Sequence, residues 1–111
     1  MSLFTLAPEK EQILDMVKEF CKKEIAPVAR ELEHKNEYPH EIVEKMKELG
    51  FFGFTIPEEY GGIGLDYVTY ALVIEEITRH WMSVAGIINS HLIMAYIVEK
   101  FGTEEQKRRF L

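Results

Sequence analysis

The chain has 111 residues, of which 47% are hydrophobic and 29% charged, and its formal net charge is −6. This composition is typical of one soluble globular domain spanning residues 1–111, and it excludes a disordered chain. The acidic balance argues against a nucleic-acid-binding protein, because polyanions attract basic surfaces.

The sequence contains a single cysteine, Cys21, so an internal disulfide or a cysteine-based zinc site is excluded. Cys21 falls among apolar residues and is expected to lie in the core. No signal peptide is visible at the N-terminus. The longest apolar region, 84–98, is interrupted by Asn89-Ser90-His91 and is expected to be too short to span a bilayer. We therefore expect a cytoplasmic protein outside the membrane.

The spacing of apolar residues predicts helices along the whole chain and no strand. The first helix begins near Pro8, where proline suits a first turn, and Pro27 should kink it further along. A second helix is expected over 39–49 and should end at Gly50. The predicted fold is all-α, an orthogonal or up-down bundle of about five helices.

Residues 51–65 predict an irregular but packed loop, because glycines and a proline alternate there with apolar anchors. A phosphate-binding loop is the alternative, since backbone amides before a helix can hold phosphate. No strand and no Gly-Lys-Ser/Thr accompany the glycines, and Asp66 occupies the place of the anion. The turn interpretation is therefore preferred.

Asp66 is expected to cap a third helix over 67–80. Ser83 should cap a fourth that Gly102 ends, and Thr103 with Gln106 forms a capping box for a fifth. The fifth helix reaches the last residue without a stop signal, so we expect an element that continues in a longer chain.

The third and fourth helices are apolar on nearly every side, which predicts an exposed apolar surface that docks onto something else. Asn89, Ser90 and His91 lie within the fourth helix in apolar surroundings. Asn89 shares one face with Ala85, Ile93 and Tyr96 at helical spacing. This face is either ordinary core packing or the wall of a pocket for a slender apolar ligand.

Two other groups of residues have simpler interpretations. Glu75 and Glu76 could do acid–base work, but an ion pair between Glu75 and Arg79 four residues later explains them better. The histidines do not show metal-ligand spacing, so no metal site is expected. The histidines are His34, His40, His80 and His91.

Several ordered motifs resemble the N-terminal helical domain of the acyl-CoA dehydrogenases, and together they cover essentially the whole chain. They are Ala26-Pro27, Glu48-Leu49-Gly50-Phe51-Phe52-Gly53, Pro57-Glu58-Glu59-Tyr60-Gly61-Gly62 with Gly64-Leu65-Asp66, Glu75-Glu76 with Arg79, and Phe101-Gly102-Thr103-Glu104-Glu105-Gln106-Lys107.

The resemblance implies an FAD-dependent α,β-dehydrogenation of acyl-CoA thioesters, with electrons passed to an electron-transfer flavoprotein and a homo-oligomeric enzyme. It places Ala85, Asn89 and Ile93 along the acyl chain. The family's catalytic glutamate, its middle β-domain and its C-terminal helical bundle have no counterpart here. No residue of this chain is therefore assigned a catalytic role, and the chain alone should be inactive and should not bind FAD tightly.

Two alternatives remain open. The chain could be a free-standing helical module that self-associates or binds a partner through its apolar face. Within the same fold, acyl-CoA oxidases and flavin monooxygenases have similar N-terminal domains. Acyl length and branching are not determined by these residues.

Overall fold

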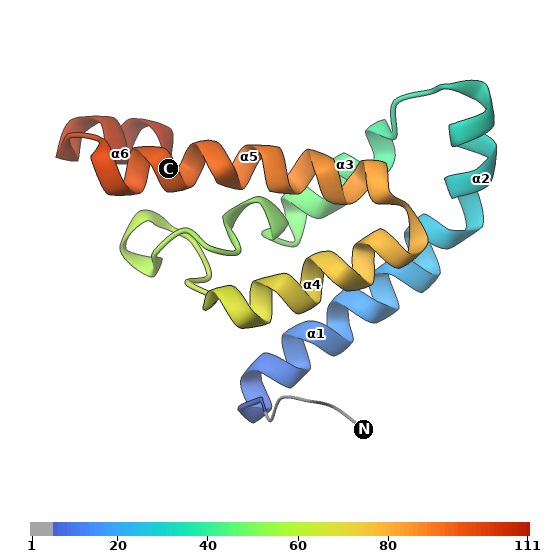
Figure 1. The fold of residues 1–111 in the computed structure, drawn as a ribbon, viewed down its shortest axis with the longest axis horizontal. Helices are drawn as coiled ribbons and strands as arrows, with labels where there is room; N and C mark the ends of the chain where they lie inside the picture. Colours follow the sequence, from blue (N-terminus) through green and yellow to red (C-terminus); the bar gives the residue numbers. More distant parts are fainter. Residues whose placement is uncertain (1–5) are drawn as a thin grey trace.

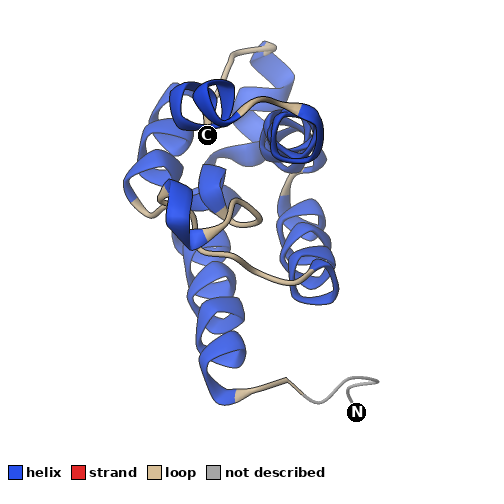
Figure 2. Cartoon of the chain, turned by 90° about the vertical axis from the view of Figure 1, so that its left-hand side faces the viewer, coloured by secondary structure: helices blue, strands red, loops and turns tan. Residues whose placement is uncertain are grey.

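The computed structural model describes residues 6–111, and every regular element in that range is helical (Figures 1 and 2). The predicted all-α class is confirmed. The elements are α1 (Pro8–Phe20), the π-helical turn η1 (Cys21–Ile25), α2 (Ala26–Lys35), α3 (His40–Glu48), the 3-10 turns η2 (Phe51–Gly53) and η3 (Glu58–Tyr60), α4 (Tyr67–His80), α5 (Met82–Phe101) and α6 (Glu104–Phe110).

The first predicted helix is divided into α1, η1 and α2 at the place where Pro27 predicts a kink. Pro27 lies in the first turn of α2 and has no N–H to donate to the helical turn before it. Its ring crowds the carbonyl four residues earlier, which belongs to Lys23 in η1. The wider π turn directly before α2 is the local response to that crowding.

Three of the four predicted signals for helix starts and stops in the C-terminal half are confirmed. Asp66 caps α4 by accepting from the Thr69 N–H at 3.3 Å. Gly102 ends α5, and Thr103 and Gln106 form the capping box of α6. The prediction for Ser83 is wrong, because α4 and α5 are separated by Trp81 alone, and α5 already begins at Met82. Trp81 is buried, and its extended backbone makes the turn.

The glycine-rich loop is packed down, as predicted. Phe51 and Phe54 have no exposed surface, and their rings lie 4.8 Å apart. The Ile63 N–H donates to the Gly53 carbonyl at 2.9 Å, and the Leu65 N–H to the Phe54 carbonyl at 2.8 Å. The loop amides are thus bound within the loop, which confirms the turn interpretation over a phosphate cradle.

The five helices from α1 through α5 and the glycine-rich loop share one hydrophobic core. Cys21 lies inside it, as predicted, and burial, followed by the nearby charge of Glu76, raises the pKa of its thiol to about 12. The largest fully buried side chains are Phe51, Phe54, Ile25, Met46, Ile77, Ile88, Val17, Val73, Val84, Thr69 and Cys21. The core holds α4 against both α1 and α5.

Helix α5 runs along one edge of the molecule, with α4 beside it and α6 folded back at its C-terminal end (Figure 1). Its inner face supplies Val84, Ala85, Ile88, Leu92 and Ala95 to the core. Large apolar side chains on its other faces are exposed, which confirms the predicted apolar surface. They are Met82, Ile93, Met94, Tyr96, Ile97 and Phe101.

The length of α5 corrects one prediction. The helix has 20 residues, because it extends at both ends beyond the apolar region 84–98, and it is long and apolar enough to cross a membrane. Asn89-Ser90-His91 does not interrupt it. One such helix, judged by length and composition alone, is weak evidence for a span.

Candidate functional site

A shallow apolar groove of about 300 Å³ lies between α4 and α5 and ends at the glycine-rich loop. Helix α4 contributes Tyr67 and Tyr70, and the loop contributes Thr55. Helix α5 contributes the remaining lining residues, which are Asn89, Leu92, Ile93, Tyr96 and Ile97. Its size and mostly apolar lining are those of a small-molecule site, although one side of it is open.

A hydrogen bond crosses this groove. The Tyr70 hydroxyl donates to Asn89 Oδ1 at 2.8 Å, which connects the two helices that form the walls. Burial raises the pKa of Tyr70 to about 12, so its hydroxyl is protonated and available as a donor at neutral pH. The bond therefore fixes the orientation of the Asn89 carboxamide.

Two further tyrosines form the rim of the groove. The rings of Tyr67 and Tyr96 meet edge to face, with centroids 6.2 Å apart. The Lys100 Nζ lies 5.8 Å from the centroid of the Tyr96 ring. A ligand in the groove would thus meet aromatic rings along one edge and aliphatic side chains of α5 along the other.

Of the three residues predicted at the site, Ala85, Asn89 and Ile93, two line the groove and one does not. Asn89 and Ile93 line the groove, and Ile93 is 54% exposed. Ala85, one turn earlier, is buried and does not line it. His91 points elsewhere on α5 and meets the ring of Phe52 edge to face, with centroids 5.2 Å apart.

Sequence reasoning missed Tyr70, which donates the hydrogen bond that crosses the groove to Asn89. An amphipathic tyrosine on an otherwise apolar helix was a signal that its hydroxyl needs a partner. The partner could not be named, because Asn89 lies 19 residues away and meets Tyr70 only through the packing of α4 on α5.

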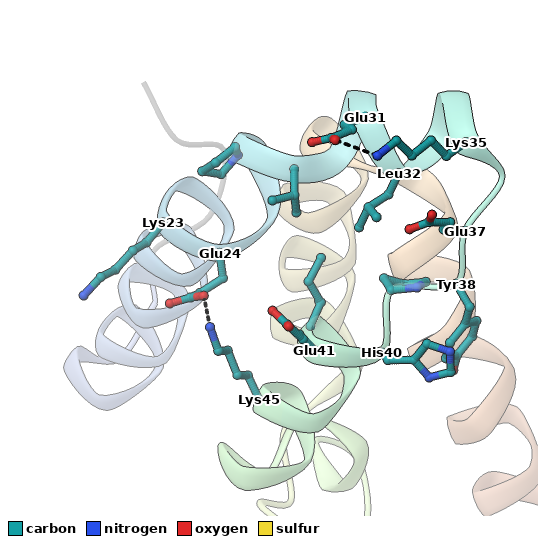
Figure 3. Close-up of a pocket in the computed structure, with 14 residues that line it drawn as sticks. Lys23, Glu24, Glu31, Leu32, Lys35, Glu37, Tyr38, His40, Glu41 and Lys45 are labelled. Carbon is teal, nitrogen blue, oxygen red and sulfur yellow. Dashed lines mark hydrogen bonds and ion pairs between the residues drawn. The ribbon is translucent and has the colours of Figure 1, made fainter.

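A second concave surface lies between α2 and α3 and has a volume of about 420 Å³ (Figure 3). Its rim is charged, and two of its lysines are already paired (Figure 3). Lys35 Nζ lies 2.9 Å from Glu31 Oε1, and Lys45 contacts Glu24. The hydrogen bond to Lys35 lowers the pKa of Glu31, and the bond to Glu24 raises that of Lys45. This cleft is a weaker candidate, because four of its charged side chains are already bound in these two ion pairs.

The acidic pair of α4 also has its partners within the helix. Glu75 Oε1 lies 2.8 Å from Arg79 Nη2, which confirms the predicted ion pair. Glu76 is less exposed and lies 3.5 Å from His80 Nε2. Among residues 6–111, no cluster of three histidine, cysteine or acidic side chains is placed to hold a metal ion.

Comparison with known proteins identifies this arrangement of helices. The family model described as acyl-CoA dehydrogenase, N-terminal domain, matches residues 7–111. A probable acyl-CoA dehydrogenase of Bacillus subtilis, YngJ, is 41% identical over 97% of this chain. The short-chain-specific acyl-CoA dehydrogenase of Clostridium acetobutylicum is 35% identical over 97% of it.

Solved structures agree on the fold. Butyryl-CoA dehydrogenase of Megasphaera elsdenii matches all of this chain with a TM-score of 0.89 and 32% identity. A chain in a structure of the electron-transferring flavoprotein of Acidaminococcus fermentans matches all of it with a TM-score of 0.90 and 36% identity.

These matches cover only part of each relative. The chain spans 29% of the length of both bacterial dehydrogenases, 30% of the Megasphaera elsdenii chain and 29% of the Acidaminococcus fermentans chain. Within that part, the match runs almost from one end of this chain to the other. The chain therefore belongs to the acyl-CoA dehydrogenase family, of which it contains the N-terminal domain.

Proposed function

We propose that residues 7–111 are the N-terminal domain of an FAD-dependent enzyme that dehydrogenates acyl-CoA thioesters between the α and β carbons. The domain would form one wall of the acyl pocket and pack on the flavin-binding domains. The observation that carries this proposal is the apolar groove between α4 and α5, open on one side, in a chain whose residues 7–111 match the acyl-CoA dehydrogenase N-terminal domain.

In this proposal, Asn89 and Ile93 contact the acyl chain, and Ala85 supports the wall from within the core. The exposed side chains of α5 beyond the groove would be covered by the remaining domains. A flavin does not fit the glycine-rich loop, because its amides donate to carbonyls of the same loop. FAD and the base that removes the α-proton would therefore be held by the parts of the relatives that this chain does not match.

The test is a chimera of the Bacillus subtilis relative in which residues 7–111 replace the matching segment. The purified chimera should carry FAD, and anaerobic addition of acyl-CoA should bleach the flavin absorbance. The unaltered relative is the positive control, and residues 1–111 alone should bind no stoichiometric flavin. A folded chimera that contains FAD but is not reduced by any acyl-CoA from four to sixteen carbons would contradict the proposal.

We further propose that the enzyme is a homo-oligomer that passes its electrons to an electron-transfer flavoprotein. The electron-transfer part of this proposal is supported by the match to a chain in a structure of the Acidaminococcus fermentans electron-transferring flavoprotein. Reduction of a purified electron-transfer flavoprotein by the acyl-CoA-treated enzyme would be measured by absorbance. Direct reaction with oxygen at a comparable rate would instead favour an acyl-CoA oxidase.

A second candidate function is self-association of the domain through α5. The observation that favours it is the exposure of Ile97 (53%) and Phe101 (81%) on one helix. Size-exclusion chromatography with light scattering would test it on residues 1–111. Ile97→Lys should dissociate an oligomer, whereas Ser90→Lys, at another exposed position of α5, should not. A monomeric wild-type chain would reject this function.

A further inference from the structure

We propose that the Tyr70–Asn89 pair makes the groove selective for acyl groups that carry a hydrogen-bond-accepting oxygen, over fully saturated alkyl groups of the same length. This inference rests on the proposed acyl-CoA dehydrogenase function. In it, Asn89 contacts the substrate, and Tyr70 is a positioning residue that acts through Asn89.

The first step is to establish which atoms of the Asn89 carboxamide already have a hydrogen-bond partner. Its Oδ1 accepts the hydroxyl proton of Tyr70 at 2.8 Å. The amide nitrogen keeps two N–H donors, and among residues 6–111 the one side-chain hydrogen bond found for Asn89 is the one to its Oδ1. Oδ1 already has a protein partner, so the groups of Asn89 that still need one from a ligand in the groove are its two N–H donors.

The second step is the change in solvent when the groove is filled. Asn89 is exposed in this structure, so water satisfies its N–H donors. A substrate chain and the covering domains would exclude that water from a groove whose other α5 lining residues are Leu92, Ile93, Tyr96 and Ile97. An N–H group that loses water and gains no acceptor is destabilising, and the penalty corresponds to about 10-fold or more in affinity.

The third step is the consequence for substrate choice. A saturated chain leaves the Asn89 donors unpaired, whereas a keto, hydroxyl or carboxylate oxygen at the matching position pairs with one of them. Sites built around a buried hydrogen bond reject analogues that cannot complete it more strongly than apolar pockets reject an extra methylene. The selectivity should appear in kcat/KM, because the contact is to the acyl chain and not to the reacting carbons.

The experiment uses the FAD-containing enzyme in which residues 7–111 supply the N-terminal domain. Its substrates are octanoyl-CoA and three analogues with one keto oxygen on C5, C6 or C7, which place the acceptor at successive depths. The measured quantity is the ratio of kcat/KM for each keto analogue to that for octanoyl-CoA. At least one keto analogue should be preferred by about 10-fold.

Three variants separate the roles of the two side chains. Asn89→Asp keeps an acceptor for the Tyr70 hydroxyl but replaces the N–H donors by oxygen, so it should abolish the preference. Asn89→Leu should do the same and raise kcat/KM for octanoyl-CoA. Tyr70→Phe should reduce the preference, because the orientation of Asn89 is released while both N–H donors remain. Far-UV circular dichroism and flavin content confirm that each variant is folded.

Two failures are distinguishable. If acyl-CoA reduces the flavin but the ratios are the same within two-fold in the wild type, Asn89→Asp and Asn89→Leu, the selectivity inference is overturned and the proposed function stands. If no acyl-CoA reduces the flavin of the folded wild type, the proposed function fails and the inference fails with it.

Discussion

The Tyr60 hydroxyl lies 3.0 Å from each carboxylate oxygen of Glu104, which joins the glycine-rich loop to the first turn of α6 across 44 residues. Arg108 completes the contact, because its Nη2 lies 3.2 Å from Glu104 Oε1 and its guanidinium lies 5.5 Å from the Tyr60 ring centroid. The most C-terminal helix is thus held to the loop by a small polar cluster.

Tyr60→Phe removes the hydroxyl and keeps the ring beneath Arg108. Since the hydrogen bond and the ion pair of this cluster are exposed, we expect a local effect, with amide hydrogens of α6 exchanging about two- to five-fold faster and the global melting temperature unchanged. Tyr38→Phe, at an exposed tyrosine on the loop between α2 and α3, is the control and should leave α6 unaffected. Equal exchange in the two variants would show that this cluster does not hold α6.

Gly62 is required by a close approach of the backbone. A Cβ at this position would lie 2.0 Å from the Ile56 carbonyl oxygen, so Gly62→Ala must displace the loop. We expect a loss of about 3 kcal/mol in the free energy of unfolding, measured by urea denaturation followed by circular dichroism.

Gly86 provides the matched control, because it lies within α5 and a Cβ there would meet nothing within 4 Å. Gly86→Ala should stabilise the protein by about 1 kcal/mol, because alanine favours a helix interior. Similar unfolding midpoints for the two alanine variants would contradict the proposed role of Gly62.

Much of this fold could be read from local signals. The N-cap Asp66, the capping box of Thr103 and the effect of Pro27 each depend on residues within a few positions of one another, and the structure has all three. The prediction that Ser83 caps the fourth helix is wrong, because packing of Trp81 in the core outweighs the local capping preference of serine. Burial of Trp81 sets the turn between α4 and α5, and the helix begins before the serine is reached.

The candidate site could be predicted only in part, because it depends on how helices pack. The face of Asn89 and Ile93 follows from helical periodicity. The opposite wall, with Tyr67 and Tyr70, follows from the packing of α4 on α5, and no pattern within either helix specifies it. The same packing buries Ala85, which periodicity alone places on the face of Asn89.

Asp66 combines a helix cap with an ion pair between α1 and α4. Besides capping α4, it accepts from the Thr69 hydroxyl at 2.7 Å and pairs with Lys10 at 2.8 Å. These bonds, that of Lys10 first, hold the pKa of Asp66 well below its usual range. Asp66→Ala should cost about 1 kcal/mol at pH 7, whereas Asp66→Asn should cost less, because asparagine caps equally well.

The pH dependence of this contribution has a defined sign. The folded pKa of Asp66 is lower than the unfolded one, so its stabilising effect is fully present above pH about 4 and is lost as the pH falls further. Unfolding midpoints of the wild type and Asp66→Ala should therefore differ at pH 7, and the difference should shrink as the pH falls from 4 towards 2. A difference that persists undiminished at pH 2 would assign the effect to packing instead of charge.

Tyr70 should be the last of the five tyrosines to ionise, because burial raises its pKa to about 12. In a spectrophotometric titration, Tyr70→Phe should remove the final ionisation step and leave the earlier ones in place. A raised folded pKa contributes stability below the unfolded value of about 10 and loses it as the pH rises towards 12. The wild type should therefore lose stability relative to Tyr70→Phe as the pH rises from 10 towards 12. A final step that survives in Tyr70→Phe would show that this hydroxyl is open to water, and the bond to Asn89 would then be too exposed to hold the carboxamide in place.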